Sequence, residues 1–352
     1  MSELTFMAPA IPCCDNPELK KSVQVHIDDL IKPKGSLGRL EELALQYILC
    51  RGSRNSGINK ACLYTFAGDH GITRQKITPY PPEVTAQMVL NMLSGGAAVS
   101  VMCRNAAIAY SVVDAGVASD LPDHPLLLKR KIAPGTDDFS VGPAMTTDQC
   151  RNALDAGVGI AASTDADIIG SGEMGIANSA SAAALYALFL DLDGKETTGA
   201  GTGASGALLE RKKEVVSGAV EFHRREWDAT PFDAVRRCGG FEIAQLCGLM
   251  LGAASRRVPV VVDGFICSAA ALAAMRMEPG VADYLFFSHV SEEHFHRSFF
   301  EKENIRPILD LGMRLGEGTG AVLAIQIIRQ ALNCYHEMAT FGSASVSRES
   351  RE

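Results

Sequence analysis

Residues 62–71 read CLYTFAGDHG, a short and almost unbroken apolar run that ends abruptly in glycine, aspartate and histidine. A run of this length and texture is typical of a strand buried on both faces, as in a parallel sheet. Four more runs resemble it and cover residues 108–115, 166–170, 258–263 and 283–288. Helical stretches such as PEVTAQMVLNML (82–93) and EIAQLCGLMLGAA (242–254) separate these runs. The alternation predicts an α/β fold with a doubly wound, mainly parallel sheet.

The residues that follow each expected strand are small or polar. GDHG follows the first run, DAG the second, SGEMG the third, DGF the fourth and SHVSEE the fifth. In an open parallel sheet the ligand crevice lies outside the carboxyl ends of the strands. Five such endings in one chain therefore indicate a binding crevice rather than five unrelated turns.

The two ends of the chain differ from its middle. Residues 1–58 contain PELKKSVQVHIDDLIK and GRLEELALQYILCRG, whose apolar residues recur at the three- and four-residue spacings of helices. The helical pattern returns from about Arg306. We therefore expect residues 1–58 plus 306–352 to form a small helical domain beside a Rossmann-like α/β catalytic domain of residues 59–305.

Charge and cysteine content restrict the class of protein. A net charge of −8 disfavours nucleic acid or an anionic membrane as a partner, because both require a dominant basic surface. The ten cysteines include no C-x-x-C pair, which suits reduced thiols in a cytosolic protein. The N-terminus lacks a basic start followed by an apolar run, and no apolar stretch approaches the ~20 residues of a membrane span. These features predict a cytoplasmic protein without membrane contact.

GAGTGASG (199–206) is one candidate for phosphate binding. It matches the G-x-G-x-x-G pattern of dinucleotide-binding loops, but the preceding LDGKETT is a poor strand, so the pattern gives little support to a dehydrogenase. A glycine-rich loop that opens a helix still offers backbone N–H groups to an anion. Lys212 and Lys213 follow it closely, and we favour phosphate binding over a purely structural loop.

GSGEMGIANSAS (170–181) has a similar arrangement of strand, glycine-rich turn and helix. Gly175 and Asn178 are candidates for further anion contacts. Glu173, placed at the turn, either supports the following helix through its dipole or takes part in chemistry. The residues alone leave these two roles of Glu173 open.

The segment SHVSEEHFH (288–296) has the residue types of a metal site but one residue too many for the H-x-x-E-H zinc motif. A ligand-binding loop with Ser291 as a hydroxyl donor fits its position at a strand end better. His70, set between Asp69 and glycines, is expected to be a structural histidine rather than a general base. No G-x-S-x-G nucleophile elbow is present. We therefore predict neither a metal nor a cofactor.

Glu317 lies in LGEGTGA, between two glycines at the mouth of a long apolar helix. It could stabilise the helix start, which is worth up to ~1 kcal/mol. It could instead act as a base, because the glycines allow close approach of another molecule and a carboxylate in a partly dry crevice has a raised pKa. We favour an enzyme that binds a phosphorylated small molecule and uses carboxylate catalysis.

Several long motifs resemble those of nicotinate-nucleotide:dimethylbenzimidazole phosphoribosyltransferases, and the similarity covers nearly the whole chain. They are KPKGSLGRLEELA (32–44), FAGDHGI (66–72), PPEVTAQMV (81–89), GEMGIANSASAAAL (172–185), TGAGTG (198–203), GGFEIAQLCGLMLGAA (239–254), PVVVDGFICSAAAL (259–272) and DLGMRLGEGTGAVLA (310–324). The resemblance implies transfer of phosphoribose from nicotinate mononucleotide to an aromatic acceptor, giving an α-ribotide for a cobamide lower ligand. It also implies a cytoplasmic homodimer.

The resemblance assigns roles to individual residues. Glu317 matches the family's catalytic base, and Glu173 could steady positive charge that develops on the ribose. The residues that match or extend the family's phosphate and nucleotide contacts are Gly175, Asn178, Thr202, Gly203, Lys213 and Ser291.

The acceptor pocket is where this chain departs from the family pattern. The candidates that face the acceptor are Tyr80, Met88, Met174 and Leu315. A tyrosine and two methionines would make the pocket narrower and more apolar, which favours phenol or p-cresol over 5,6-dimethylbenzimidazole. The alternative is that these side chains are ordinary packing and benzimidazole still fits. Family members that act on phenols pair with a paralogous subunit, so the chain could form a heterodimer.

The rival from another class is a non-catalytic, phosphate-sensing subunit of the same fold. The presence of Glu317, Glu173 and Lys213 argues against it, because a subunit relieved of catalysis would be free to lose them.

Overall fold

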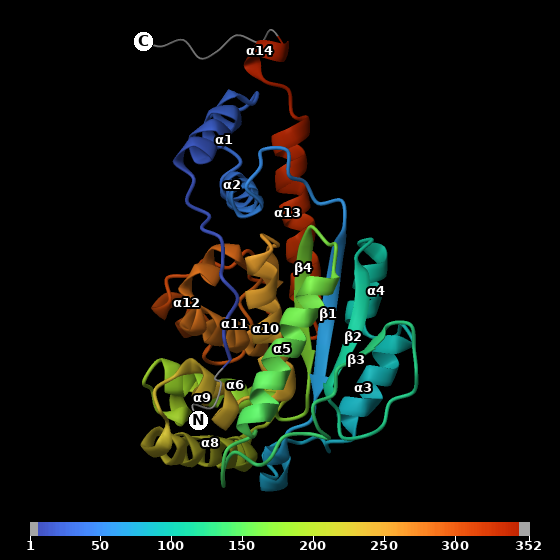
Figure 1. Cartoon of the computed structure of the whole chain (residues 1–352), viewed down its shortest axis with the longest axis vertical. Helices are drawn as coiled ribbons and strands as arrows, with labels where there is room; N and C mark the ends of the chain where they lie inside the picture. Colours follow the sequence, from blue (N-terminus) through green and yellow to red (C-terminus); the bar gives the residue numbers. More distant parts are fainter. Residues whose placement is uncertain (1–5, 345–352) are drawn as a thin grey trace.

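The computed structural model describes residues 6–344, whose six strands form a single parallel sheet (Figure 1). The strands are β1 (Ala61–Gly68), β2 (Ala109–Gly116), β3 (Leu127–Lys129), β4 (Ile168–Met174), β5 (Val260–Val262) and β6 (Leu285–Phe287). Their order across the sheet is β3-β2-β1-β4-β5-β6. This is the order of a doubly wound nucleotide-binding fold, so the predicted α/β class is confirmed.

Helices connect the strands and extend the chain beyond the sheet. They are α1 (Pro17–Asp29), α2 (Arg39–Arg51), α3 (Val84–Leu93), α4 (Ala98–Asn105), α5 (Thr147–Ser163), α6 (Asn178–Phe189), α7 (Gly194–Thr197), α8 (Gly206–Glu226), α9 (Pro231–Cys238), α10 (Phe241–Ser255), α11 (Phe265–Met277), α12 (His296–Lys302), α13 (Thr319–Glu337) and α14 (Phe341–Ala344), with 3-10 turns η1 (Gly71–Gln75) and η2 (Pro279–Tyr284). Local sequence sets several starts. The Asn16 side chain caps α1, and Thr146 with Gln149 forms a capping box on α5.

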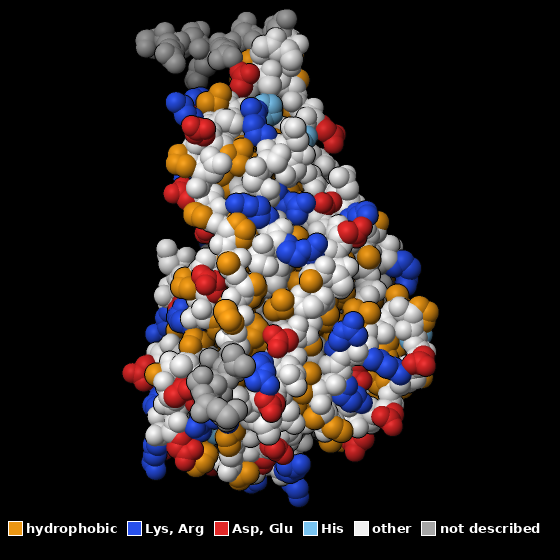
Figure 2. All heavy atoms as spheres, in the orientation of Figure 1, with side chains coloured by type: hydrophobic (Ala, Val, Ile, Leu, Met, Phe, Trp, Pro, Cys, Tyr) orange, Lys and Arg blue, Asp and Glu red, His pale blue; other side chains and the backbone are white. Residues whose placement is uncertain are grey.

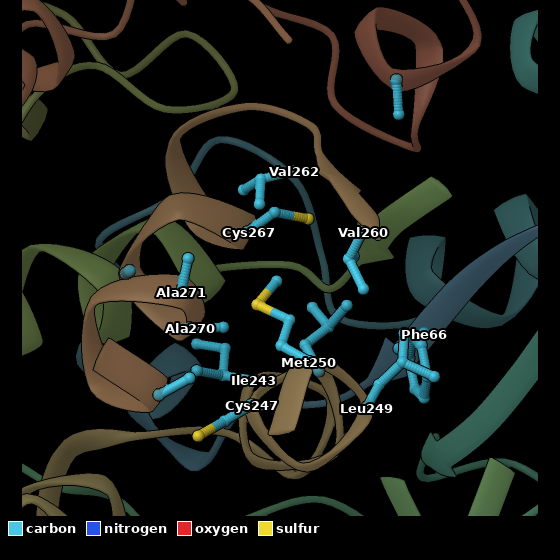
Figure 3. Close-up of a cluster of buried hydrophobic side chains, with 14 of the residues drawn as sticks. Phe66, Ile243, Cys247, Leu249, Met250, Val260, Val262, Cys267, Ala270 and Ala271 are labelled. Atoms are coloured by element: carbon cyan, nitrogen blue, oxygen red, sulfur yellow. The ribbon is translucent and has the colours of Figure 1, made fainter. Parts of the chain in front are cut away.

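Helices cover both faces of the sheet. Successive residues of a strand point to opposite faces. On β1, Phe66 lies near Leu249 of α10 (Figure 3). Leu63 lies on the side of α13, because a Cβ on Gly170 would contact the side chains of both Leu63 and Ile325. The helix α10 packs against β1, β2, β4 and β5, with α5 and α11 beside it, while α4 contacts both α13 and β2.

The main core lies between α10, α11 and the sheet. Figure 3 shows Met250 of α10 pointing toward Val260 and Cys267, all of them buried. The helices α5 and α10 approach so closely that a Cβ on Gly157 would lie 2.0 Å from the Gln245 carbonyl oxygen. Glycine at this position therefore permits the close packing of the two helices.

The sheet places its ligand crevice between β1 and β4. The order of the strands reverses there, and ligands of doubly wound folds bind at such a point. In register, Phe66 of β1 lies beside Glu173 of β4, and Ala67 lies beside Met174. The polar strand endings therefore meet at the carboxyl edge of the sheet, as predicted.

Two details differ from the sequence-based expectation. The edge strand β3 was not predicted, because it has only three residues and no extended apolar run. The strand β4 continues to Met174, so Glu173 lies on a strand and not in the turn where we expected it. A strand rich in glycine, with the sequence IIGSGEM, has the composition of a loop, which explains the error.

The N-terminal helices contact the far end of α13. The helix α2 packs against α1 and α13, and the Ile31 N–H donates to the Ala339 carbonyl at 3.0 Å. The first turns of α13 contact the sheet instead, so one helix serves both parts of the molecule.

The division into residues 1–58 plus 306–352 and residues 59–305 stays a prediction. Residues 1–5 and 345–352 of the expected small domain lie outside the described residues.

Residues 84–105 are long and apolar enough, by length and composition, to cross a membrane, with a mean hydropathy of 1.4. We had expected no such stretch. The segment is divided into α3 and α4, which pack against each other and against the sheet. On the face drawn in Figure 2, basic and acidic side chains are interspersed.

Candidate active site

Glu317 lies in a turn whose backbone is left-handed at three consecutive residues. Gly316, Glu317 and Gly318 have φ angles of 82°, 66° and 105°. This conformation costs a glutamate roughly 1–2 kcal/mol. The Thr65 hydroxyl holds the turn by donating to the Glu317 carbonyl at 2.7 Å, and Gly172 of β4 packs against the same peptide. The surrounding sheet therefore fixes where Glu317 sits.

Asp263, directly after β5, satisfies the start of α13. Its carboxylate accepts hydrogen bonds from the backbone N–H groups of Gly318 (2.9 Å), Gly320 (2.8 Å) and Ala321 (3.1 Å). A carboxylate at this end of a helix pairs with free donors and interacts favourably with the helix dipole. Because Asp263 supports the helix start, the Glu317 side chain is not needed for that purpose.

The Glu317 carboxyl is buried and incompletely paired. Its side chain is 4% exposed, and Oε2 has no hydrogen-bond partner among the described residues. Burial raises the pKa of Glu317, the Asp263 charge raises it further, and the backbone N–H of Val99 at the start of α4 opposes both. A carboxyl group with a raised pKa is suited to accept a proton near neutral pH.

The glycines on either side of Glu317 are required by the chain's own packing. A Cβ on Gly316 would lie 2.4 Å from Oε1 of Glu173, and a Cβ on Gly318 would lie 2.8 Å from the Leu63 side chain. These two glycines therefore allow the turn that carries Glu317 to pack closely against the sheet. This packing also brings Glu173 next to the turn that carries Glu317.

Glu173 is a second buried carboxyl at the end of β4. The Asn178 side-chain amide donates to its Oε2 atom. Burial raises the pKa of Glu173 to about 8, and the charges of Asp263, Glu242 and Glu317 add to the effect. The Glu173 side chain therefore contacts the first residue of α6 and has a raised pKa, and its role, helix support or chemistry, stays a prediction.

A cleft opens beside these carboxyl groups. Its lining includes Glu173, Met174, Gly175, Asn178, Ser179, Gly201, Thr202, His289, Ser291, Glu293, Arg314, Leu315 and Gly316. A second hollow, lined by Gly203, Lys213 and their neighbours, shares Gly201, Glu293 and Arg314 with the first. The two hollows are therefore adjacent. Together the two hollows are lined by all the residues that we predicted to contact the phosphate: Gly175, Asn178, Thr202, Gly203, Lys213 and Ser291.

The loop 199–206 is held from two sides. The Gly201 N–H donates to both carboxylate oxygens of Glu293, at 3.0 and 2.9 Å. From the opposite side, Lys212 Nζ donates to the Gly199 carbonyl and to Ser179 Oγ, both at 2.9 Å. The expectation that the loop's N–H groups are free is thus wrong at Gly201, because Glu293 occupies that donor.

The two lysines after the loop differ in their environments. Lys212 is 3% exposed, and burial lowers its pKa to about 8. Lys213 is on the more open side of α8, where it pairs with Glu210 at 3.0 Å. The element directly before the loop is the helix α7 and not a strand, which agrees with the expectation that the loop is not a dinucleotide-binding finger.

The histidine-rich segment around Ser291 forms hydrogen bonds within the protein. The Ser291 N–H donates to His296 Nδ1 at 2.9 Å, so the His296 proton lies on Nε2, which faces Ser268 Oγ at 3.0 Å. Burial lowers the pKa of His296 to about 3, which keeps the ring neutral. The Ser291 hydroxyl accepts from the Glu293 N–H at 3.3 Å. Among the hydrogen bonds of the described residues, the Ser291 hydroxyl proton has no acceptor, and Ser291 lines the cleft.

His70 is buried, and its ring contacts two side chains. Nε2 lies 2.6 Å from Glu242 Oε1 and Nδ1 lies 3.0 Å from Ser181 Oγ. Burial alone would lower the pKa of His70, but Glu242 raises it. These contacts agree with the expected structural role.

Comparisons with known proteins identify the family. A profile described as "Phosphoribosyltransferase" matches residues 14–346. A protein of Prosthecochloris aestuarii called nicotinate-nucleotide–dimethylbenzimidazole phosphoribosyltransferase is 48% identical over 335 residues, which are 94% of this chain and 95% of that protein. A protein of the same name from Oleidesulfovibrio alaskensis is 44% identical over 351 residues, 98% of each chain. The crystal structure of CobT from Thermus thermophilus has a TM-score of 0.90 and 41% identity, and the match covers 95% of this chain and all of that one.

The chain belongs to the nicotinate-nucleotide:dimethylbenzimidazole phosphoribosyltransferase family. The resemblance drawn from the motifs is therefore confirmed, as is the general activity of a phosphoribosyltransferase.

The residues that we expected to face the acceptor in this phosphoribosyltransferase lie in two places. Met174 and Leu315 line the cleft. Tyr80 is 49% exposed and belongs to the loop before α3, where the Thr78 hydroxyl lies 3.5 Å from that of Thr202. Met88 is half-buried on α3, one turn after Thr85, whose hydroxyl accepts from the Ile176 N–H. The acceptor role of these residues stays a prediction.

Three residues of this phosphoribosyltransferase site were not assigned a role from the sequence. Asp263 stands in one of the strand endings, DGF, and Glu293 in another, SHVSEE. The polar endings of the strands were a signal for both. Lys212 was noted beside Lys213, but its buried position depends on how α8 faces α6, which the sequence pattern did not specify.

We expect Asp263→Asn to weaken both the fold and catalysis. Whichever way the new amide is turned, its NH₂ group faces at least one of the N–H donors that Asp263 now accepts, which costs about 1–3 kcal/mol. The turn carrying Glu317 should shift as well. Chemical denaturation and steady-state kinetics would measure the two effects. Asp310→Asn is the matched control, because Asp310 forms an exposed ion pair with Arg297, and such pairs contribute little to stability. Unchanged stability and kcat in Asp263→Asn would contradict the role given to Asp263.

Proposed function

We propose that the chain transfers the phosphoribosyl group of nicotinate mononucleotide to an aromatic acceptor, giving an α-ribotide for a cobamide lower ligand and releasing nicotinate. The observation that carries the proposal is the buried Glu317 carboxyl, whose Oε2 has no partner among the described residues. It lies next to Gly316, which lines a cleft, and this cleft and the adjacent hollow contain hydroxyl, glycine and lysine groups for a phosphate. The names of the relatives support the same donor and a benzimidazole acceptor.

In the proposed step, Glu317 removes the proton from the acceptor as the acceptor attacks C1′ of the ribose. The electrons of the C1′–N bond pass to the pyridinium nitrogen, which neutralises the ring and releases nicotinate. Attack from the face opposite nicotinate converts the β-ribotide to the α-ribotide. The Val99 N–H at the start of α4 lowers the pKa of Glu317, so the carboxyl lies near α4, and α3 packs beside α4. The acceptor would thus approach from the side of α3 and α4.

We propose that Glu173 stabilises positive charge on the donor, which requires its ionised form. Because burial raises the pKa of Glu173 to about 8, most of this group is protonated at pH 7 in the empty enzyme. The cationic pyridinium ring would lower that pKa, so donor binding should release a proton. Isothermal titration calorimetry at pH 7, in buffers with different ionisation enthalpies, would count the protons. Glu173→Gln should release fewer; the same number in both proteins would exclude this role.

Two acceptors are candidates, and different observations favour them. The names of the relatives support 5,6-dimethylbenzimidazole. The ring of Tyr80 would narrow the pocket, and Met88 and Met174 would make it more apolar. These side chains favour a single ring such as phenol or p-cresol, which would give an O-linked riboside. Purified chain with nicotinate mononucleotide and equal amounts of 5,6-dimethylbenzimidazole and p-cresol, followed by chromatographic separation of the ribotides, would distinguish them. Formation of neither ribotide would contradict the proposed activity of the isolated chain.

If the pocket selects phenols, the double variant Tyr80→Ser with Met88→Gln should shift the preference toward benzimidazole. Serine in place of Tyr80 widens the pocket, and the two new polar side chains offer hydrogen bonds to the second ring nitrogen. The ratio of kcat/KM for the two acceptors would measure the shift, which we expect to be roughly 10–100-fold, the range for a changed pocket contact. The variant Leu90→Gln, at an exposed position on α3, is the control. An unchanged ratio would mean that Tyr80 and Met88 only pack against their neighbours and do not select the acceptor.

We also propose a cytoplasmic enzyme that acts as a homodimer or as a heterodimer with a paralogous subunit. A phenol-specific enzyme would favour the heterodimer. Light scattering of the purified chain, alone and with the paralogue, would decide between the two forms. A chain that binds nicotinate mononucleotide but is inactive with and without the paralogue would support the alternative, a phosphate-sensing subunit.

A further inference from the structure

We infer that Cys14 and Cys50 form a thiol-oxidation site, at which a hydroperoxide converts the two thiols into a disulfide. Both cysteines are free thiols in this structure. Cys14 lies in the segment before α1, and Cys50 lies in the last turn of α2. Neither residue lines the cleft or the adjacent hollow, so the inference does not depend on the function proposed above.

The segment before α1 is held next to Cys50 by two side chains of the α/β part. In Figure 1 this segment leads from the α/β part of the molecule to α1. The Tyr284 hydroxyl donates to the Pro12 carbonyl at 2.7 Å. The Arg257 guanidinium donates to the Cys13 carbonyl at 3.2 Å and to the Cys50 carbonyl at 3.4 Å. One rigid, planar group therefore holds the backbone on both sides of the thiol pair.

The two thiols contact each other and differ in acidity. The Cys50 thiol donates a hydrogen bond to the Cys14 sulfur, and this bond lowers the pKa of Cys14 to about 7. Tyr284 and Arg257 lower this pKa further, whereas burial and the Asp283 charge oppose them. The contact with Cys14 and burial raise the pKa of Cys50. Near pH 7, Cys14 is therefore the nucleophilic thiolate and Cys50 keeps its proton.

This difference assigns the two steps of the oxidation. The Cys14 thiolate attacks one oxygen of hydrogen peroxide, the O–O bond breaks, and Cys14 becomes a sulfenic acid. The hydroxide that leaves takes up the proton that Cys14 lost on ionising. The Cys50 sulfur then attacks the Cys14 sulfur, and the sulfenic hydroxyl leaves with the Cys50 proton as water. Two thiols and one peroxide thus give one disulfide and two waters.

The other buried cysteines are less suited to react. Burial raises the pKa of Cys62, Cys103, Cys150, Cys238, Cys247 and Cys267, which keeps these thiols protonated. Cys14 is 7% exposed and Cys50 is 1% exposed, so a small oxidant reaches Cys14 first. Cys13 is exposed beside Cys14, and its sulfur accepts from the Asp15 N–H at 3.3 Å. It provides a control for simple accessibility.

The disulfide would close a loop of residues 14–50, which contains α1 and α2. The helix α2 packs against α13 and η2. A cross-link between distant positions restricts the unfolded chain and so favours the folded one. Oxidation should therefore tie the two N-terminal helices to the segment that Tyr284 and Arg257 hold.

The test treats the reduced full-length protein with hydrogen peroxide at pH 7, followed by alkylation, digestion and mass spectrometry. The expected result is a peptide that links Cys14 to Cys50, with the loss of two thiols per chain and their recovery with dithiothreitol. Cys50→Ser should stop at a sulfenic acid on Cys14, which dimedone traps. Cys14→Ser should give no linked peptide, and the matched control Cys13→Ser should react as the wild type does.

Thermal unfolding gives a second readout. The oxidised wild-type protein should unfold several degrees above the reduced protein, because the cross-link closes a long loop. The difference should be absent in Cys50→Ser. Peroxide treatment that leaves Cys14 and Cys50 open to alkylation, or that links Cys14 to a cysteine other than Cys50, would overturn the inference. Both outcomes are observed on the wild-type protein, so neither requires a variant to fold.

Discussion

Glu317→Gln should lower kcat by about 10²–10⁴-fold, the usual contribution of a positioned general base. The amide has the shape of the carboxyl group but cannot take the acceptor's proton. KM for nicotinate mononucleotide should change little, because the substitution leaves the residues proposed to bind the phosphate unchanged. Steady-state kinetics with saturating acceptor would measure both. Glu337→Gln, at the exposed far end of the same helix, is the matched control. A decrease of less than tenfold would mean that another group removes the proton.

The pH dependence of kcat/KM in the wild-type enzyme should also show the protonation of Glu317. Burial raises the pKa of Glu317 above the value of an ordinary glutamate. The base is therefore lost by protonation as pH falls through this raised pKa, and the acid limb of kcat/KM should lie above pH 4.5, the ordinary value for glutamate. The limb that belongs to Glu317 should disappear from the residual activity of Glu317→Gln. A limb from Glu173, whose pKa is raised to about 8, should remain in that variant, because the proposed role of Glu173 requires its ionised form. An unchanged pH profile in the variant would exclude Glu317 as the base.

Gly172→Ala should cause a loss of similar size without altering any chemical group. A Cβ at this position of β4 would lie 2.2 Å from the Glu317 carbonyl oxygen and 2.7 Å from the Gly318 nitrogen. These are backbone atoms, so the whole turn must move. A displacement of about 1 Å at a reacting group can cost roughly 100-fold in rate, and overpacking costs about 1–3 kcal/mol of stability. Kinetics and chemical denaturation of the variant would measure both.

Gly159→Ala is the control for Gly172→Ala. Gly159 lies on the exposed face of α5, and a Cβ there would have no neighbour within 4 Å. Alanine should stabilise this helix by up to about 1 kcal/mol and leave kcat unchanged. If Gly172→Ala kept full activity, the turn would be able to adapt, and the close packing of β4 against Glu317 would not fix the base.

Much of this fold could be predicted from the sequence because its strands are buried on both faces. Continuous apolar runs identified five of the six strands, and the residues after them identified the edge where the site lies. The strand β3 escaped notice because three residues give no pattern. The strand β4 was cut short because glycine normally weakens a strand, whereas here Gly172 is small enough to admit the Glu317 turn.

The candidate site was only partly predictable. Glu317 stood out by its flanking glycines, and its family motif gave it a role. The division of tasks among neighbouring residues depends on contacts between distant segments. Asp263 supports α13 from a strand 55 residues earlier in the chain. Whether Lys212 or Lys213 is buried depends on the rotation of α8 against α6. Sequence patterns specify which residue types are present, but such pairings arise only from tertiary packing.

Among the described residues, Oε2 of Glu317 has no hydrogen-bond partner, and this lowers the stability of the folded enzyme. A buried polar atom without a partner costs free energy in the folded state. The empty enzyme therefore keeps less stability than its packing alone would provide, and strain at the left-handed Glu317 adds to the deficit. Molecules that bind only the folded chain and offer this oxygen a proton would offset that cost and shift the balance away from unfolding. Supply of its substrates would thus influence how long the enzyme persists, as well as how fast it works.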